Sequence, residues 1–231
     1  MSPLELAGRA LKAKVYELLT SVDIETALEK LYRFPARRVI NPLFTFLYNN
    51  DEQTRWRAVT AVGSVVSKLA DEDVESARVI IRRLMWNLND ESGGIGWGSP
   101  EAMGEILASN EALAKEYARI LISYAREDGN FQEHECMQRG VLWGIGRLSQ
   151  VRPELVKNAA KPLIPYLKSP DASVRGLTAW IMGLLGVDEA LSDLGRLTQD
   201  ETVIQIYMNR RLIKRRVKEL AEEAIRSIPG D

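Results

Sequence analysis

The sequence is short of the two residue types that build most disulfide-bonded and metal-binding proteins. It has one cysteine, Cys136, and one histidine, His134. A single cysteine excludes a disulfide within the chain and any zinc site made from several cysteines. Acid–base chemistry would have to rest on His134, carboxylates or lysine, and no Ser-His-Asp, paired-carboxylate or Walker signature is present. We therefore expect a protein that is not an enzyme, with no catalytic residue, cofactor or metal.

The sequence also lacks long hydrophobic runs and net charge. Its longest mostly apolar stretch, Gly176–Val187, has twelve residues, too few to cross a bilayer. Glu5, Arg9, Lys12 and Lys14 occupy the region where a secretion signal needs an apolar run. Thirty-one basic and thirty-two acidic residues leave a charge of -1, which argues against a basic nucleic-acid module. We expect a cytoplasmic protein without membrane insertion, with another protein rather than nucleic acid as its partner.

What the sequence does contain is helical periodicity. Hydrophobic residues make up 45% of the 231 residues and charged ones 27%, as in globular proteins. Val59, Val62, Val66 and Leu69 recur three or four apart, which gives one apolar stripe on a helix. We find no alternating apolar and polar run bounded by hairpin turns. The sequence therefore predicts an all-α chain.

Turns and glycines recur along the chain at a spacing near 40 residues. Acidic turn residues follow one another at intervals of 39, 38, 43 and 29, at Asp51, Asp90, Asp128, Asp171 and Asp200. The helix after each of the first four turns carries an aligned glycine, at Gly63, Gly104, Gly146 and Gly183. Two helices in each period of about 40 residues are typical of a solenoid. We predict a right-handed α-α superhelix of about five helical pairs.

Residues 162–180, PLIPYLKSPDASVRGLTAW, resemble a HEAT repeat of the phycobilisome-lyase-like type, with its LxxLLxDxxxxVRxxAAxALG pattern. The resemblance is weaker at 41–69, 79–108 and 119–150, and faint at 191–225. The segments GGIGWGSPEAMGE and QRGVLWGIGRL are also similar to an uncharacterised family of bacterial HEAT-repeat proteins associated with anaerobic sulfate reducers. The repeat class implies a HEAT/ARM-like scaffold or binding surface, and it implies no particular activity.

The ends of the chain differ from the repeats. No linker rich in proline, glycine or serine divides the sequence, so we predict a single α-solenoid domain. We assign 1–40 to N-terminal capping helices, 41–200 to HEAT-like repeats, and 201–231 to a C-terminal cap formed by one long helix over 201–228. Ser21 or Asp23 would cap the second of the N-terminal helices. Such caps cover the apolar faces that end repeats expose.

Alignment on the glycines places most tryptophans in two columns. The position seven before each glycine holds Trp56, Trp97, Arg139 and Gly176, and the position three before holds Thr60, Glu101, Trp143 and Trp180. These spacings put both columns on one helix face, opposite Val62, Met103, Ile145 and Met182. Second helices line the concave side of HEAT solenoids, so the resemblance implies an aromatic groove. We predict that a segment of another protein binds at Trp56, Trp97, Glu101, Arg139, Trp143 and Trp180.

Two alternatives stay open at this point. The tryptophans could instead fill space between adjacent repeats, with the glycines only permitting close helix packing. A different class of function would be an enzyme or enzyme subunit of the HEAT-like lyase or glycosylase type, acting on a prosthetic group or nucleic acid. That second alternative rests on the resemblance alone.

Three further features have a structural explanation beside a functional one. The glycine-rich segment Ser92–Pro100 lacks a nucleotide-binding motif, and a flexible turn into a helix explains its composition. His134 and Cys136 are two soft ligands where zinc needs three or four, so no metal is expected there. The basic cluster between Arg210 and Lys218 either attracts an anionic partner or keeps an outer helix face in solvent.

Overall fold

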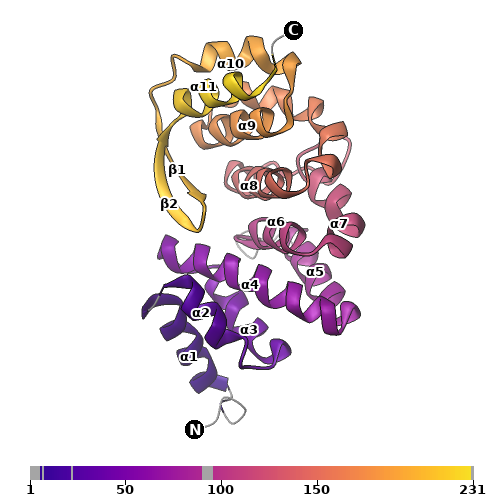
Figure 1. The fold of residues 1–231 in the computed structure, drawn as a ribbon, viewed down its shortest axis with the longest axis vertical. Helices are drawn as coiled ribbons and strands as arrows, with labels where there is room; N and C mark the ends of the chain where they lie inside the picture. The colour runs from indigo at the N-terminus through magenta and orange to yellow at the C-terminus, as the bar shows by residue number, and fades with distance from the viewer. Residues whose placement is uncertain (1–5, 7, 22, 90–95, 230–231) are drawn as a thin grey trace. The chain divides into compact units, whose positions relative to one another are not determined.

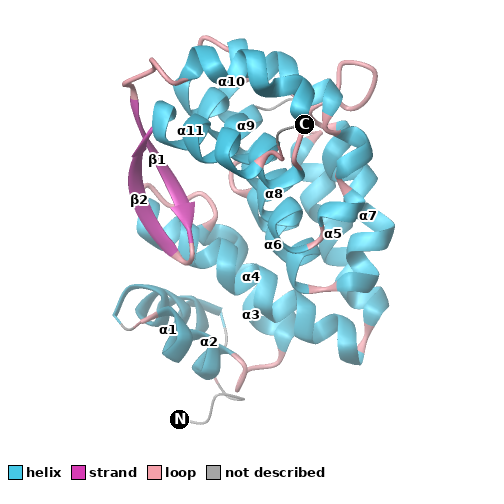
Figure 2. Cartoon of the chain, turned by 45° about the horizontal axis from the view of Figure 1, so that its top comes forward, coloured by secondary structure: helices cyan, strands magenta, loops and turns pink. Residues whose placement is uncertain are grey.

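The chain divides into two compact units, Met1–Asn110 and Glu111–Asp231. The computed structural model describes residues 6, 8–21, 23–89 and 96–229 (Figure 1). Helices dominate both units, as Figure 2 shows. Each unit is described separately below.

Unit 1 contains two helical pairs preceded by two helices. Its elements are α1 (Gly8–Ser21), α2 (Ile24–Leu31), α3 (Ala36–Phe46), α4 (Glu52–Glu72), α5 (Val74–Leu88) and α6 (Ser99–Ser109). The second helices of the two pairs, α4 and α6, pack along each other. The first helices, α3 and α5, pack on this layer, and α1 and α2 contact α3 and α4.

Unit 2 contains three pairs, in which α8, α9 and α11 form the layer of second helices (Figure 1). Its α-helices are α7 (Glu111–Ser123), α8 (Glu135–Val151), α9 (Ala172–Leu185), α10 (Leu191–Leu197) and α11 (Val217–Ser227). Four 3-10 helices connect them: η1 (Pro153–Leu155), η2 (Lys157–Ala159), η3 (Lys161–Lys168) and η4 (Asp188–Ala190). Because Pro165 lies inside this segment and lacks the backbone N–H that an α-helix needs, η3 takes the place of a first α-helix. Among the described residues, unit 1 has two pairs and unit 2 has three, which agrees with the predicted number of about five.

Aspartate side chains start four of the helices. Asp23, Asp51, Asp73 and Asp171 each accept a hydrogen bond from the backbone N–H three residues later, at 2.8–3.0 Å. This bond satisfies one of the amide groups that the first turn of a helix leaves without a partner. The turns predicted at Asp51 and Asp171 are therefore helix caps, and Asp23 rather than Ser21 caps α2.

The prediction of one helix over 201–228 is wrong. The segment forms an antiparallel hairpin, β1 (Val203–Met208) and β2 (Arg211–Arg216), followed by the shorter α11. The strands are joined by Asn209 and Arg210, both with positive φ (49° and 62°), as a type I′ turn requires. β-branched and aromatic residues favour the strand over the helix, and the hairpin lies beside α9 (Figure 2).

Glycines let the second helices approach closely. A Cβ atom on Gly183 would lie 2.7 Å from the Cα atom of Ala224 on α11, and one on Gly146 would overlap the Trp180 ring. In unit 1, a Cβ on Gly63 would overlap the Glu105 side chain. These three glycines therefore permit close packing inside each unit, as the structural alternative for the glycine column predicts.

Candidate functional site

In unit 1, the predicted site residues lie at the amino-terminal ends of two packed helices. Trp56 is in the second turn of α4, Glu101 is in the first turn of α6, and Trp97 comes two residues before α6. The charge of Arg55 lowers the pKa of Glu101, so the starts of α4 and α6 lie near each other. Trp56 is half-buried, whereas Trp97 is 49% exposed.

A buried polar cluster supports the backbone next to Trp97. Asn87 donates to the hydroxyl of Tyr48 at 3.2 Å and to that of Ser99 at 3.5 Å, which joins the ends of α3 and α5 to the start of α6. Gly98 has φ of +73°, and a Cβ there would lie 2.9 Å from the Leu47 carbonyl oxygen. Only glycine suits this position, which turns the chain so that Trp97 reaches solvent.

Glu101 is the most perturbed acid of the site. Its Oε2 atom is buried and has no hydrogen-bond partner among the described residues. Burial raises the pKa of Glu101 to about 7, and its own backbone N–H and Arg55 only partly oppose this effect. Arg55 itself is paired with Glu52 at 3.0 Å. The Oε2 atom of Glu101 is thus an acceptor that no described donor satisfies.

In unit 2, the hairpin covers the predicted site. The indole Nε1 of Trp143 donates to the backbone carbonyl of Tyr207 at 2.7 Å, and the two rings are 6.2 Å apart. Trp143 is 3% exposed as a result. Ile204 of β1 fills the space above Gly176, which lies on the corresponding face of the next second helix, α9. In this structure the chain's own strand therefore occupies the face that was predicted to hold a partner at Trp143.

The other two predicted residues of unit 2 make contacts between repeats. The half-buried Trp180 of α9 lies against Gly146 of α8. Arg139 donates from Nε to Oδ2 of Asp171, the cap of α9, at 3.0 Å. Both contacts join α8 to α9, and the partner-binding role of these residues stays a prediction.

Sequence reasoning missed Tyr207 and the hairpin that carries it. The available signal for a hairpin was the pair Asn209-Arg210, which follows the run Val203–Met208 and precedes a second run of the same length. The basic side chains that follow the turn are largely neutralised. Arg215 pairs with Glu219 and Glu223, and Arg216 and Lys218 pair with Glu201.

The remaining sequence features add little. Ser92–Ile95 of the glycine-rich segment lies outside the described residues. His134 and Cys136 are exposed at the start of α8. The described ranges contain no group of three or more His, Cys, Asp or Glu side chains arranged to hold a metal. None of the described helices combines the length and hydrophobicity that a membrane span requires.

Comparison with known proteins identifies the class of repeat. The family model for the HEAT-like repeat matches residues 137–185, which cover α8, η3 and α9. An engineered protein from the Northeast Structural Genomics Consortium is 16% identical, covering 96% of this chain and 97% of its own, with a TM-score of 0.55. The chain therefore contains a HEAT-like repeat and has the fold of HEAT and armadillo solenoids, as predicted.

Two further proteins resemble most of the chain. A designed armadillo repeat protein in complex with the peptide (KR)4 is 16% identical, with a TM-score of 0.53 over 94% of this chain and 98% of its own. A protein of Archaeoglobus fulgidus described as uncharacterized is 26% identical over 182 residues, 78% of this chain and 92% of its own. The narrower resemblance to a bacterial family of sulfate reducers stays a prediction.

Proposed function

We propose that the protein is a non-enzymatic interaction scaffold that binds a segment of a partner protein at the starts of α4 and α6. The observation that carries the proposal is Glu101, whose buried Oε2 atom lacks a hydrogen-bond donor. A carboxylate of this kind is stabilised by a donor from a bound partner, either a backbone N–H or a basic side chain. Trp97, 49% exposed, supplies an apolar contact of the type that dominates interfaces.

The chain's own hairpin supports this choice of partner. In unit 2, an extended strand gives its backbone carbonyl to Trp143, three residues before the aligned glycine Gly146. Glu101 holds the same position before Gly104 in unit 1. At this position unit 2 has a donor, the indole N–H of Trp143, whereas unit 1 has an acceptor, the carboxylate of Glu101. Glu101 therefore suits an extended segment that offers backbone N–H groups or cationic side chains. The (KR)4 complex of a designed armadillo protein of similar fold is consistent with a basic segment.

Retention of a natural partner tests the proposal. Immobilised wild-type protein is incubated with extract of its own cells and compared with Trp97→Ala and Glu101→Gln. Both substitutions should lose the same bound protein while leaving the unfolding temperature within a few degrees of wild type or above it. Trp86→Ala is the matched control, because Trp86 is an exposed tryptophan of unit 1 outside the site. Retention that is unchanged in Trp97→Ala and Glu101→Gln would contradict the proposal.

The cytoplasmic location stays part of this proposal. A scaffold in the cytoplasm also agrees with the single free cysteine, Cys136, since reducing compartments keep thiols free.

A further inference from the structure

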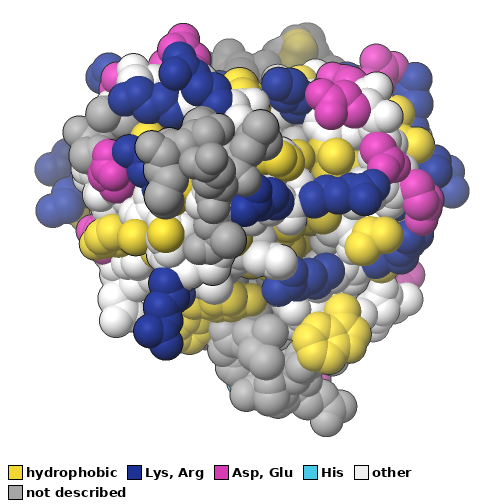
Figure 3. Space-filling model, turned by 90° about the horizontal axis from the view of Figure 1, so that it is seen from below, with side chains coloured by type: hydrophobic (Ala, Val, Ile, Leu, Met, Phe, Trp, Pro, Cys, Tyr) yellow, Lys and Arg dark blue, Asp and Glu magenta, His cyan; other side chains and the backbone are white. Residues whose placement is uncertain are grey.

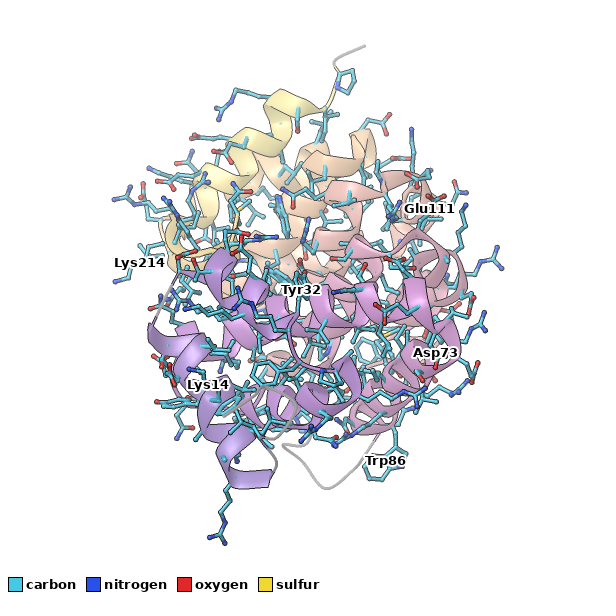
Figure 4. All side chains as sticks on the ribbon, turned by 60° about the horizontal axis from the view of Figure 1, so that its bottom comes forward. Lys14, Tyr32, Asp73, Trp86, Glu111 and Lys214 are labelled. Atoms are coloured by element: carbon cyan, nitrogen blue, oxygen red, sulfur yellow. The ribbon has the colours of Figure 1, made fainter. Side chains whose placement is uncertain are left out.

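Helix α5 exposes two large apolar side chains on one face. Trp86 is 63% exposed and Val79 is 55% exposed. They are seven residues apart, which places them on the same side of the helix about 10 Å from each other. Figure 4 shows Trp86 pointing away from the ribbon. A tryptophan held in solvent on a regular helix is typical of an interaction surface.

Positive charge surrounds this apolar pair. Arg83 donates to Asn41 Oδ1 at 2.6 Å and lies 4.4 Å from the Phe44 ring centroid, so neither contact neutralises its charge. Together, α3, α5 and the cap Asp73 carry five arginines against two carboxylates, which leaves three positive charges. Figure 3 shows basic side chains lying between hydrophobic ones on the face turned to the viewer. The surface thus suits an apolar, negatively charged counterpart.

Unit 2 contains an apolar cavity with the carboxylate of Glu127 at its rim. It has a volume of about 560 Å³, within the range of about 300–1,000 Å³ that pockets for large ligand groups show. Its apolar walls come from Ala125, Phe131, Pro162, Pro165 and Tyr166. The Tyr166 hydroxyl donates to the Ala125 carbonyl at 3.0 Å, which fixes that ring in the wall. The cavity is large enough for an indole ring.

The rim of the cavity carries two basic and two acidic side chains, Arg126, Lys168, Glu127 and Asp128. Arg126 is paired with Asp128, and Lys168 is paired with Asp193 at 3.3 Å, whereas Glu127 has no ion-pair partner in the described part of the chain. Burial and then the Glu127 charge raise the pKa of Tyr166 to about 12, which places that carboxylate beside the cavity. Glu127 is therefore an uncompensated negative charge next to an apolar pocket.

We propose that the protein associates with itself head to tail, with Trp86 of one copy inserted into the cavity of unit 2 of the next copy and Arg83 facing Glu127. The two surfaces differ, so the contact is heterologous and repeats into a ring or a chain of copies. A second copy is favoured as the occupant because both complementary surfaces are encoded in this one sequence. A lipid surface fits less well, since only Trp86 and Val79 would enter it.

Analytical ultracentrifugation of the full chain tests the proposal. The average mass of wild type should increase with protein concentration and decrease with added salt, because a charge pair contributes. Trp86→Ala and Glu127→Arg should each weaken association at least about tenfold. Neither residue is buried, so unfolding temperatures should stay unchanged. Val203→Ala is the control and should associate like wild type, because Val203 is 55% exposed and lies outside both proposed sites.

Mixing two variants gives the decisive result. Trp86→Ala keeps the cavity, and Pro165→Glu, which puts a charge in the cavity wall, keeps Trp86. Each variant alone should be monomeric, and their mixture should form 1:1 dimers and nothing larger. A wild type still monomeric at about 1 mM, or mixed variants that do not dimerise, would overturn the proposal. So would binding of the wild type to phosphatidylserine vesicles without self-association.

Discussion

Arg175 donates from Nε to Oδ2 of Asp200 at 2.9 Å, and this pair joins the start of α9 to the turn after α10. Arg139 and Asp171 form the equivalent pair one repeat earlier. An arginine at the start of a second helix thus reaches an aspartate at the next turn along the chain. Two of the predicted turn aspartates, Asp171 and Asp200, therefore hold neighbouring repeats together.

Replacing Arg175 should destabilise unit 2. Arg175 also donates to the carbonyls of Ser169 and Pro170, so Arg175→Ala removes one donor from each of three acceptors. We expect the free energy of unfolding to fall by about 2–3 kcal/mol. Arg139→Ala should cost only about 1 kcal/mol, because the Arg139 side chain is half in solvent. Urea unfolding measures both, and equal losses would contradict the argument.

Because α9 approaches α11 closely at Gly183, we predict that alanine is less favourable than glycine at this helical position. Alanine is favoured over glycine inside a helix by about 1 kcal/mol. Gly183→Ala should nevertheless destabilise the protein by about 1–3 kcal/mol, because the added methyl group meets the backbone of Ala224. Gly195→Ala in α10 is the matched control, since a Cβ there has no neighbour within 4 Å. Thermal unfolding should show Gly195→Ala at or above wild type.

The stability lost on replacing a tryptophan should depend on how deeply its ring is buried. Trp143→Ala removes a buried ring and its bond to Tyr207, and we expect a loss of about 3–5 kcal/mol in the free energy of unfolding. Trp97→Ala should cost less than about 1 kcal/mol, because the ring is half exposed. A comparably large loss in Trp97→Ala would assign Trp97 to the core of unit 1 and remove it from the proposed site.

Glu101 predicts a pH dependence with a definite sign. Its pKa is about 7 in the folded protein against an ordinary value of 4.5. Between these values the folded chain holds a proton that the unfolded chain has released, so raising the pH favours unfolding. This contribution should lower stability by up to about 3 kcal/mol from pH 4.5 to 7 and then level off. In Glu101→Gln the decline should be absent, which urea unfolding at pH 5 and pH 8 measures.

Asp200 should act in the opposite direction at lower pH. Although burial opposes it, hydrogen bonds from Thr202 and Arg175 lower the pKa of Asp200 below its ordinary value of 3.8. Its contribution is present above that value and is lost as pH falls through the lowered pKa. Arg175→Gln should therefore reduce the stability lost on acidification below pH 4. An unchanged acid transition would show that the pair contributes little.

Short-range chemistry explains what could be predicted. Asp51 and Asp171 bond to amides three residues away, so their role was readable from the chain itself. The same holds for the solenoid fold, because each repeat buries its apolar stripe against a neighbour of similar sequence. These features need no knowledge of distant contacts.

The hairpin and the site depended on distant contacts. The apolar residues of 203–217 fit a helical spacing as well as a strand, and burial of Ile204 against α9 and of Tyr207 against Trp143 selects the strand. Trp143 and Tyr207 are 64 residues apart in sequence. Nor does any local pattern reveal that the Oε2 atom of Glu101 is buried without a donor among the described residues.

The bond between Trp143 and Tyr207 limits how unit 2 could grow. In most repeat proteins each repeat touches only its neighbours, so whole repeats can be duplicated or lost. The hairpin, however, precedes α11 and reaches past α9 to α8. A repeat inserted between α8 and α9 would move the Trp143 indole about 10 Å away from the Tyr207 carbonyl. That distance is about half the length of β1, whose six residues cover about 20 Å. Insertion of a repeat at this point would therefore break the bond between Trp143 and Tyr207.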